Sequence, residues 1–540
     1  MMQPAMAIDV LIVGGGMAGL TAAAYLSRAG LKVLLCEKEP KIGGLVNSFE
    51  HKGFVFDGGI RAIENSGIIL PMLRELGIRL DFLPSPVSIG IERDVVRIAT
   101  RDSLRAYQEL LGRHFPGNRA DIAAIIREIE KIMGYMDVLY GIDNPLFLDL
   151  RKDPQYAFRT IVPWLLKYML TAPKIARLNQ PVDEYLSRFS SNRALIDIIA
   201  QHFFQETPTF FALSYFSLYL DYRYPRGGTG AMARAMERYV LEQCGEIRTD
   251  TEITRLDPGA HRATDASGNT YQYRRLVWAA DLKTLYRIAN LASVSDGRAL
   301  RKIRARQLAV EDKLGGDSVL TVYLMLNLDK AYFEQISSAH FFYTPCTSGL
   351  SGANLRQLVD QGPGHAARFT ADRERIIAWL LRHLELTTYE ISCPVLRDDS
   401  LAPAGQTGLI VSFLFDFALT KHIQGLGWYG AFRELVAERV TKVLDGTIYP
   451  GLSAAVMESF ASTPLTIERI TGNAEGAITG WAFTNPVMPA VNKLPQVARS
   501  VLTPLPDTYQ AGQWTYSPSG LPISILTGRL AANRVLKDLT

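Results

Sequence analysis

A glycine-rich turn near the N-terminus constrains the fold more than any other segment of the chain. The apolar run Val10-Leu11-Ile12-Val13 has the composition of a strand that is buried on both faces. It leads directly into Gly14-Gly15-Gly16-Met17-Ala18-Gly19 and then into an alanine-rich segment that predicts a helix to about Ala29. Strand, turn and helix in this order are typical of the βαβ unit of a Rossmann-type domain, so we predict an α/β fold that binds a dinucleotide.

Each glycine of the turn has its own expected role. Gly14 makes the tight turn, Gly16 lets the backbone approach a pyrophosphate, and Gly19 lets the helix pack closely on the strand. Met17 and Ala18 begin the helix, whose first N–H groups attract phosphate. We therefore expect all five residues in the cofactor site.

An acidic residue follows at the expected distance. Lys32-Val33-Leu34-Leu35-Cys36 predicts a second strand, and Glu37 comes next, eighteen residues after Gly19. That spacing suits a carboxylate that accepts hydrogen bonds from a ribose, and it would repel a 2′-phosphate. We place Glu37 and its neighbour Lys38 in the cofactor site; the alternative is a glycine-rich turn without a ligand.

Length, charge and cysteine content narrow the class of protein. A chain of 540 residues is long enough for two or more domains. Its 58 basic and 54 acidic residues give a formal net charge of +4, too weak a bias to indicate nucleic-acid binding. The four cysteines are widely separated and form no Cys/His cluster, so we expect neither a disulfide framework nor a metal site and favour a reducing, cytoplasmic location.

The sequence also argues against membrane insertion. Residues 1–7 lack a basic segment and a cleavage site, so we expect no signal peptide. No stretch reaches the roughly 20 uninterrupted apolar residues that a spanning helix needs. We therefore expect the protein not to cross a membrane.

Two further glycine-containing segments carry a family resemblance. Lys41-Ile42-Gly43-Gly44-Leu45 and Gly53-Phe54-Val55-Phe56-Asp57-Gly58-Gly59-Ile60-Arg61 resemble the segments that follow the Rossmann turn in the amine oxidase and phytoene desaturase superfamily. The alternative is a pair of surface turns. The resemblance implies non-covalently bound FAD, with Gly44, Leu45, Gly59, Ile60 and Arg61 beside the cofactor.

The resemblance continues to the C-terminus. Tyr224-Pro225-Arg226-Gly227-Gly228-Thr229-Gly230, Asp399-Ser400-Leu401-Ala402-Pro403-Ala404-Gly405 and Ala511-Gly512-Gln513-Trp514-Thr515 resemble landmarks of phytoene desaturases, carotenoid isomerases and retinol saturases. Many relatives have aspartate where this chain has Gln513, and saturases tend to have histidine where it has Arg61, so the subfamily stays open. The resemblance implies further cofactor contacts at Ile253, Ala280, Gly512, Gln513, Leu521, Pro522 and Ser524.

The order of these segments predicts a discontinuous architecture. The FAD-binding domain should be assembled from residues 1–90, 222–300 and 485–540. Residues 91–221 and 301–484 should form an inserted α+β substrate domain, as in the p-hydroxybenzoate hydroxylase and amine oxidase architecture. We expect the active site at the junction of the two domains.

Two intervening segments are candidates for handling an apolar substrate. Residues 154–181 contain four basic residues, no acidic residue and many aromatic and aliphatic ones, a composition that suits a helix at a membrane interface. An ordinary buried helix with a charged edge is the alternative. Residues 202–222 are dense in aromatics and could line a tunnel or belong to the core, while His202 and Glu206, four apart, should share one helix face.

The resemblance implies an FAD-dependent oxidoreductase that desaturates, saturates or isomerises a long apolar polyene or isoprenoid by hydride transfer at flavin N5. Arg61 and Glu64 are the candidate catalytic residues because they follow Gly58-Gly59, which the resemblance implies is a flavin-facing turn. Only one GxGxxG turn is present, so electrons should be exchanged with oxygen, a membrane quinone or a reduced carrier. The alternatives are a flavin amine oxidase and a non-catalytic lipid carrier that contains FAD.

Overall fold

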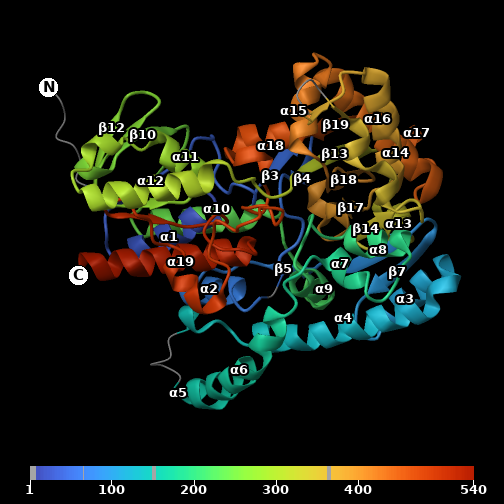
Figure 1. Cartoon of the computed structure of the whole chain (residues 1–540), viewed down its shortest axis with the longest axis horizontal. Coiled ribbons are helices and arrows are strands. Elements are labelled where there is room, and N and C mark those ends of the chain that lie inside the picture. Colours follow the sequence, from blue (N-terminus) through green and yellow to red (C-terminus); the bar gives the residue numbers. More distant parts are fainter. Residues whose placement is uncertain (1–7, 65, 149–153, 362–366) are drawn as a thin grey trace.

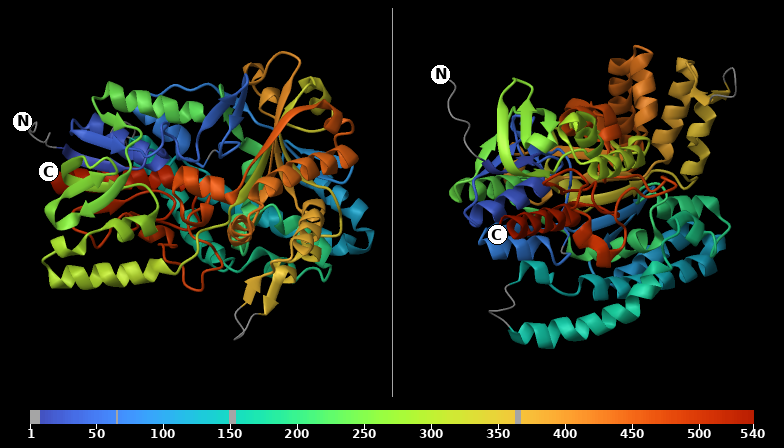
Figure 2. Two further views of the ribbon diagram at one scale, coloured as in Figure 1. Left: turned by 90° about the horizontal axis from the view of Figure 1, so that it is seen from above. Right: turned by 60° about the vertical axis from the view of Figure 1, so that its left-hand side comes forward.

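The computed structural model describes residues 8–64, 66–148, 154–361 and 367–540, which form two seven-stranded sheets with helices packed around each (Figures 1 and 2). Residues 1–7, on which the expectation about a signal peptide rests, lie outside the described residues. Within the described part of the chain, none of the helices combines the length and apolar character needed to span a bilayer.

The first sheet is parallel at its centre and takes strands from three separate parts of the chain. Its strand order is β10-β11-β12-β1-β2-β9, with β20 paired to β12; the pairs β10–β11 and β11–β12 are antiparallel and the other pairs are parallel. This arrangement confirms the Rossmann-type fold. The strands are β1 (Ile8–Val13), β2 (Val33–Cys36), β9 (Glu246–Arg248), β10 (Ile253–Asp257), β11 (Arg262–Asp265), β12 (Thr270–Trp278) and β20 (Thr508–Gln510).

The central strand β1 is buried on both faces, as its continuous apolar sequence predicts. Val10 and Ile12 pack against the helices of one face, whereas Leu11 and Val13 belong to the core of the other. The first face is covered by α1 (Met17–Arg28), α10 (Gly230–Glu242) and α19 (Leu521–Leu539), and the second core includes residues of α11 (Leu282–Ile288) and α12 (Gly297–Glu311).

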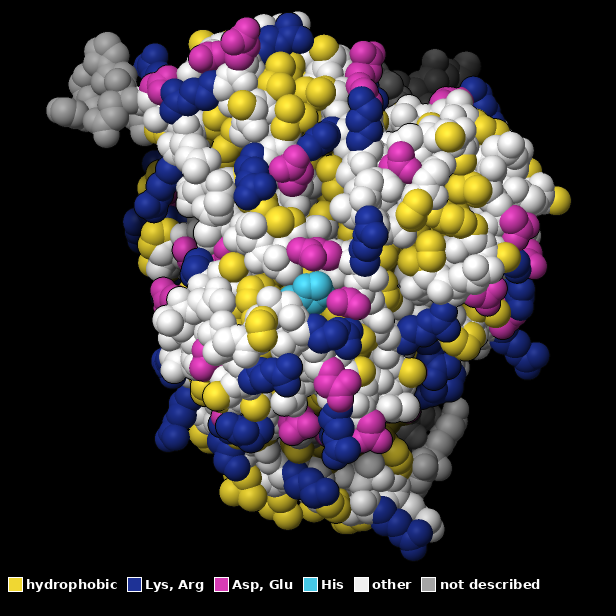
Figure 3. Space-filling model, turned by 90° about the vertical axis from the view of Figure 1, so that its right-hand side faces the viewer, with side chains coloured by type: hydrophobic (Ala, Val, Ile, Leu, Met, Phe, Trp, Pro, Cys, Tyr) yellow, Lys and Arg dark blue, Asp and Glu magenta, His cyan; other side chains and the backbone are white. Residues whose placement is uncertain are grey.

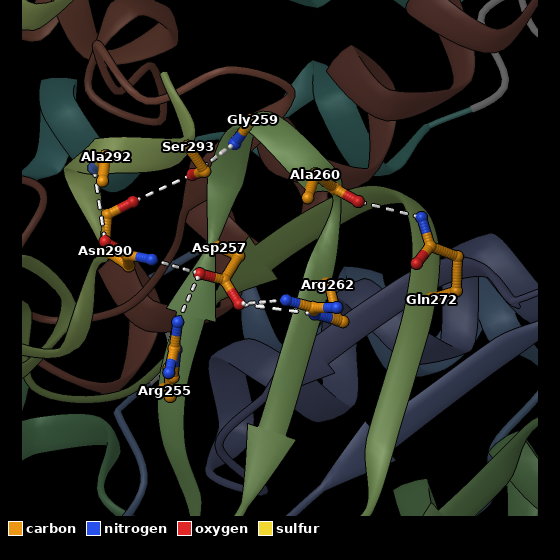
Figure 4. A network of polar contacts seen from close by, with 9 residues as sticks. All are labelled: Arg255, Asp257, Gly259, Ala260, Arg262, Gln272, Asn290, Ala292 and Ser293. Atoms are coloured by element: carbon orange, nitrogen blue, oxygen red, sulfur yellow. Dashed lines mark hydrogen bonds and ion pairs between the residues drawn. The ribbon is translucent and has the colours of Figure 1, made fainter. Parts of the chain in front are cut away.

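A buried carboxylate organises the outer hairpin of this sheet. Asp257, at the end of β10, accepts hydrogen bonds from Arg255 at 3.2 Å, Arg262 at 3.0 Å and Asn290 at 2.6 Å (Figure 4). Burial alone would raise the pKa of Asp257, but these three donors outweigh it and hold the pKa below the usual value. The network ties β10, β11 and the segment after α11 together.

The second sheet has the order β19-β13-β18-β17-β14-β6-β7, and all its pairs are antiparallel except β14 with β6. One face packs on three helices that lie at the upper right in Figure 1: α14 (Arg373–Leu386), α15 (Phe417–Gly425) and α16 (Tyr429–Thr447). The strands are β6 (Val87–Ile91), β7 (Asp94–Ile98), β13 (Val319–Leu326), β14 (His340–Thr344), β17 (Tyr389–Ser392), β18 (Thr407–Leu414) and β19 (Val456–Ser462).

The opposite face of the second sheet is covered at both of its sides. At the β6 and β14 side, Phe342 and the strand β6 pack with helices from the middle of the chain. At the other side, Phe49 of β3 (Ser48–His51) and Phe56 of β4 (Phe54–Asp57) pack on the rings of Tyr323 and Phe460. The rest of this face looks toward the first sheet. The packed helices are α3 (Ser103–His114), α4 (Arg119–Tyr140), α7 (Val182–Leu186), α8 (Arg193–Ala200) and α9 (Thr209–Leu218).

Smaller elements connect and flank the two sheets. One short hairpin, β3 with β4, and one short antiparallel pair from distant parts of the chain, β5 with β8, lie close to the junction. These elements are α2 (Ile69–Leu76), β3 (Ser48–His51), β4 (Phe54–Asp57), β5 (Phe82–Pro84), β8 (Arg223–Pro225), α5 (Pro154–Tyr156), α6 (Val162–Ala176), α13 (Lys330–Glu334), β15 (Val359–Gln361), β16 (Ala367–Phe369), α17 (Leu452–Ala455) and α18 (Pro464–Thr471).

Two of the predicted domain boundaries fall inside regular elements. Residue 90 lies within β6, which belongs to the second sheet, and residue 300 lies within α12, whose Ile303 and Val310 pack with the first sheet. Cutting either element would divide one hydrophobic core. We therefore propose boundaries before Val87 and after Glu311.

The expectation that His202 and Glu206 share a helix face was wrong. Helix α8 ends at Ala200 and α9 begins at Thr209, and the six residues from 201 to 206 form turns. Glu206 has a φ of 52°, in the left-handed region, which no residue of a right-handed helix adopts. The spacing of four residues therefore does not place the two side chains on one helix face.

Candidate active site

A cavity of about 1610 Å³ lies at the junction of the two sheets. Residues of the glycine-rich turn, the second sheet, α6 and α9 all line it. Every residue predicted to contact the cofactor lines this cavity except Gly19: Gly14, Gly16, Met17, Ala18, Glu37, Lys38, Gly44, Leu45, Gly59, Ile60, Arg61, Ile253, Ala280, Gly512, Gln513, Leu521, Pro522 and Ser524.

The glycine-rich turn leaves free space only where a ligand would need it. Gly14 has a φ of 106°, and a Cβ on it would lie 2.7 Å from the carbonyl oxygen of Ala279. A Cβ on Gly19 would lie 2.0 Å from the carbonyl oxygen of Gly14, so Gly19 serves the packing of α1 on the turn. A Cβ on Gly16 would meet no protein atom within 4 Å, and this open space is cavity.

Glu37 stands at the end of β2, beside the turn. Its carboxylate accepts hydrogen bonds from the backbone N–H groups of Gly15 at 2.6 Å and Glu39 at 2.9 Å. Burial raises the pKa of Glu37, although both N–H groups act in the opposite direction. The carboxylate is thus held against the wall of the cavity, where it can accept a hydrogen bond from a ribose hydroxyl.

Asp57, for which the sequence predicts no role, fixes the segment Gly58-Gly59 that lines the next part of the cavity. Its buried carboxylate accepts hydrogen bonds from Ser48 Oγ at 2.8 Å, Tyr224 Oη at 2.7 Å, and Thr229 N and Oγ1, both at 2.8 Å. These donors come from β3, from β8 and from the segment before α10. The signal in the sequence is a lone acidic residue at the end of an apolar strand, directly before Gly58.

Arg61 joins this segment to the second sheet. Its guanidinium donates to the backbone carbonyl oxygens of Asp57 and Gly59 and, at 2.9 Å, to Ser412 Oγ of β18. The side chain is buried, with a relative exposure of 5%. We conclude that Arg61 positions the turn against the second sheet.

The C-terminal helix closes the cofactor side of the cavity. Gly512 has a φ of 101°, and its N–H donates to Thr527 Oγ1 of α19 at 2.9 Å. A Cβ on Gly528 would lie 2.4 Å from the carbonyl oxygen of Ala18, so α19 and α1 approach each other more closely than a larger residue would permit. The second turn of α19 therefore stands beside the N-terminus of α1.

Aromatic side chains line the substrate side of the cavity. They come from α6 and from residues 202–222, for which the sequence predicts either a tunnel lining or a part of the hydrophobic core. Several of these rings also contact one another, with Phe211 and Tyr215 at 5.3 Å and Tyr219 and Phe342 at 5.1 Å between centroids. The lining residues are His202, Phe203, Phe204, Phe210, Phe211, Tyr215, Tyr219 and Tyr222, with Trp164, Tyr168 and Met169 of α6.

Glu64, a candidate catalytic residue, also lines the cavity. Burial raises the pKa of its carboxyl to about 7. Tyr140, Tyr215 and Tyr222 are close enough to be affected by its charge. Glu64 can therefore hold a proton near neutral pH in an aromatic environment.

These residues fit FAD. The space over Gly16 lets the backbone approach a pyrophosphate closely, and the N-terminus of α1 provides N–H donors for it. The carboxylate of Glu37 provides a hydrogen-bond acceptor for a ribose. The cavity then continues past Gly59 and Gln513 toward the aromatic lining. A dinucleotide with a large apolar ring system suits both ends of such a site.

Relatives with curated names match almost the whole chain. A chloroplastic prolycopene isomerase of Daucus carota is 22% identical over 98% of this chain and 80% of its own length. A 4,4′-diapophytoene desaturase (4,4′-diaponeurosporene-forming) of Staphylococcus aureus is 20% identical over 98% of this chain and 99% of its own.

Solved structures share the fold. Putrescine oxidase bound to putrescine superposes with a TM-score of 0.58 and 13% identity, covering 99% of this chain and 100% of its own. Cyclohexylamine oxidase from Brevibacterium oxydans superposes with a TM-score of 0.58 and 12% identity over the same shares of the two chains. At these identities the likeness establishes the fold.

The open space over Gly16 generates a direct test of the cofactor site. We expect Gly16→Val to abolish the yellow absorbance of the purified protein, because the added methyl groups fill space that the pyrophosphate needs. Gly430→Val is the matched control, since a Cβ on Gly430, in the first turn of α16, also meets no atom within 4 Å but lies outside the cavity. A Gly16→Val protein that stays yellow would contradict the assignment.

The family follows from a match that covers more than half of the chain. The sequence profile described as "Flavin containing amine oxidoreductase" matches residues 17–316, a range that includes α1, Glu37, Asp57 and Gly59. The carotenoid-related relatives and the FAD-binding fold agree with this match. The chain therefore belongs to the flavin containing amine oxidoreductase family and is an FAD-dependent oxidoreductase.

Proposed function

We propose that this enzyme acts on carbon–carbon bonds of a long apolar polyene or isoprenoid. The observation that supports the proposal most strongly is that one cavity is lined both by the cofactor-site residues and by the aromatic side chains of residues 202–222. At about 1610 Å³ it exceeds the roughly 300–1000 Å³ typical of a site for one small ligand. It has room for a cofactor and an extended second molecule end to end.

The protein's part in such a reaction is alignment and exclusion of water. FAD, when bound, accepts or delivers a hydride and so carries the redox chemistry. The aromatic lining would hold a polyene so that one C–H bond faces the cofactor side of the cavity, and it would keep water away from the reacting carbon. The relatives, a prolycopene isomerase and a diapophytoene desaturase, support a polyene substrate.

Three outcomes are compatible with this chemistry: desaturation, saturation and cis–trans isomerisation. A desaturase would pass its electrons to oxygen or a membrane quinone, and a saturase would draw them from a reduced carrier. An isomerase would need FAD kept reduced and would exchange no net electrons. The flavin absorbance distinguishes the three.

The test is an anaerobic titration of the FAD-loaded protein, followed by flavin absorbance and product analysis. We expect 4,4′-diapophytoene in micelles to bleach the oxidised flavin if the enzyme is a desaturase. Reoxidation of reduced flavin by a polyene marks a saturase, and conversion of prolycopene under reducing conditions without spectral change marks an isomerase. Bleaching by putrescine or cyclohexylamine and by neither polyene would favour an amine oxidase, and a flavin that responds to none of them would favour a lipid carrier.

We further propose that helix α6 contacts a lipid surface through which the substrate enters. The helix lies along the lower edge of the molecule in Figure 1 and in the right-hand view of Figure 2. Figure 3 shows hydrophobic side chains beside Lys and Arg at this lower end. The exposed residues, which we name the α6 apolar face, are Phe158 at 76%, Val162 at 48%, Leu165 at 47%, Leu166 at 62%, Met169 at 63% and Leu170 at 73% exposure.

Charge and position support a membrane rather than a protein partner. Arg159, Lys167, Lys174 and Arg177 are exposed on the same segment, which has no acidic residue between Pro154 and Pro181. Basic residues beside an apolar helix face favour anionic lipid. Trp164, Tyr168 and Met169 of α6 line the cavity, and Met169 also belongs to the α6 apolar face, so a chain that leaves the lipid could reach the aromatic side chains without crossing water.

Vesicle binding tests this surface. We expect Leu166→Glu together with Leu170→Glu to weaken co-sedimentation with phosphatidylglycerol vesicles about tenfold or more, because two apolar anchors become anionic. Leu308→Glu is the control, since Leu308 of α12 is 69% exposed but lies on another part of the molecule. Equal sedimentation of both variants and the unmodified protein would contradict the proposal.

A further inference from the structure

A row of polar side chains crosses the cavity face of the second sheet. The strand register places Glu390 of β17 opposite Ser412 of β18, and Ser412 opposite Thr321 of β13. Ser412 Oγ and Thr321 Oγ1 lie 2.8 Å apart, and Arg61 donates to Ser412 at 2.9 Å. The row therefore runs from the flavin-facing turn, which Arg61 holds, to Glu390.

Glu390 is the member of this row that presents a carboxylate to the cavity. It lines the cavity with a side-chain exposure of 37%, and its Oε1 lies 3.2 Å from Nε2 of His340. His340, on the adjacent strand β14, is only 3% exposed and lies beneath the carboxylate. The ring of His340 packs against Tyr222 at 5.3 Å and Phe342 at 5.0 Å between centroids, which fixes its orientation.

The surroundings keep Glu390 ionised. Burial alone would raise its pKa, but the contact with His340 and the positive charges of Arg61 and Arg397 lower it further than burial raises it. Burial lowers the pKa of His340, and the contact with Glu390 acts in the opposite direction. The other titratable groups that interact with Glu390 are Tyr215, Tyr219 and Tyr222.

An anion at this place has a use in the proposed reaction. When a hydride leaves a substrate carbon, that carbon becomes positively charged, and an anion in a site with little water stabilises the charge strongly. Arg61 is unsuited to this role because its charge has the wrong sign and two of its donors are engaged by backbone carbonyl oxygens.

We propose that Glu390 is a catalytic carboxylate that stabilises positive charge on the substrate chain, and that His340 is the positioning residue that holds it. The inference rests on the proposed function. In the desaturation direction, one C–H bond breaks and its electron pair leaves as hydride to FAD, the oxidant. The neighbouring C–H bond then breaks, its electrons form the new double bond, and its proton passes to a carboxylate oxygen of Glu390.

A carboxylate with a low pKa is sufficient for this proton transfer. A proton next to a positively charged carbon is strongly acidic, so its transfer to Glu390 is downhill. Saturation uses the same groups in reverse: protonated Glu390 gives its proton to one carbon while the neighbouring carbon receives the hydride.

The charge of Glu390 can be tested by binding alone. The probes are an isoprenoid with a quaternary ammonium group in mid-chain, which FAD cannot oxidise to an imine, and the neutral hydrocarbon of the same length. We expect the FAD-loaded protein to bind the ammonium compound about tenfold or more tightly than the hydrocarbon, as perturbation of the flavin spectrum would measure, because the cation resembles the charged transition state. We expect Glu390→Gln to lose this preference and Glu390→Asp to keep it.

Glu64→Gln is the matched comparison, because Glu64 is the other acidic residue placed in the substrate side of the cavity. A preference that survives Glu390→Gln would overturn the proposal, and so would a preference abolished by Glu64→Gln alone. Thermal unfolding of each variant, with flavin absorbance as the readout, separates these outcomes from misfolding.

The positioning role of His340 predicts a pH shift. In the unmodified protein, the preference for the ammonium probe should disappear as the pH falls through the lowered pKa of Glu390. Replacing His340 by Phe removes a contact that lowers this pKa, so the loss should occur at higher pH in His340→Phe. An unchanged pH profile would show that His340 does not act through Glu390.

Turnover gives a separate readout. If a polyene bleaches the flavin, Glu390→Gln should slow that step about a hundredfold or more, as loss of one stabilising group does in other enzymes. If no polyene reacts with the unmodified protein but the ammonium preference depends on Glu390, the charge assignment holds and the polyene substrate is wrong. The two proposals therefore fail separately.

Discussion

The buried carboxylate of Asp57 is the contact on which the rest of the site depends. It accepts hydrogen bonds from the hydroxyl groups of Ser48, Tyr224 and Thr229 and from the backbone N–H of Thr229, so it joins the segment around Ser48 to a segment more than 160 residues further along the chain. Because a buried carboxylate without such donors would be costly, these segments can only pack here if all of them arrive together. The turn that follows Asp57 is thereby fixed, and Arg61 extends it to the second sheet. These polar contacts connect the segment around Gly59, on the cofactor side of the cavity, to Ser412 of the second sheet.

The two faces of the second sheet differ in polarity. Its strands place apolar residues against α14 and α16, as the alternation of a half-buried sheet requires. The other face turns polar groups, Thr321, Glu390 and Ser412, toward a cavity that is also lined by the aromatic side chains of residues 202–222. A chain built only to hold a hydrocarbon would have no need of a carboxylate there. The position of Glu390 therefore indicates that the cavity handles charge as well as apolar surface.

Local sequence patterns pointed to many residues that line the cavity near the glycine-rich turn, but not to the polar residues of the second sheet that also line it. The turn at Gly14–Gly19 and Glu37 lie within one βαβ unit, so short-range spacing reveals them. Glu390 and His340 meet only because β14 and β17 pair across a long separation, and neither belongs to a motif. The supposed helical pair of His202 and Glu206 failed because tertiary packing places turns there. The aromatic density of 202–222 was visible, but the cavity beside it was not.

We propose that one cavity holds FAD and a polyene end to end. A crystal structure of the FAD-loaded protein soaked with a polyene would show both molecules. We expect the flavin ring beside Gly59 and Gln513, and the polyene between Glu390 and the aromatic side chains that lead to α6. Polyene bound elsewhere, or flavin filling the space beside those aromatic side chains, would contradict this proposal.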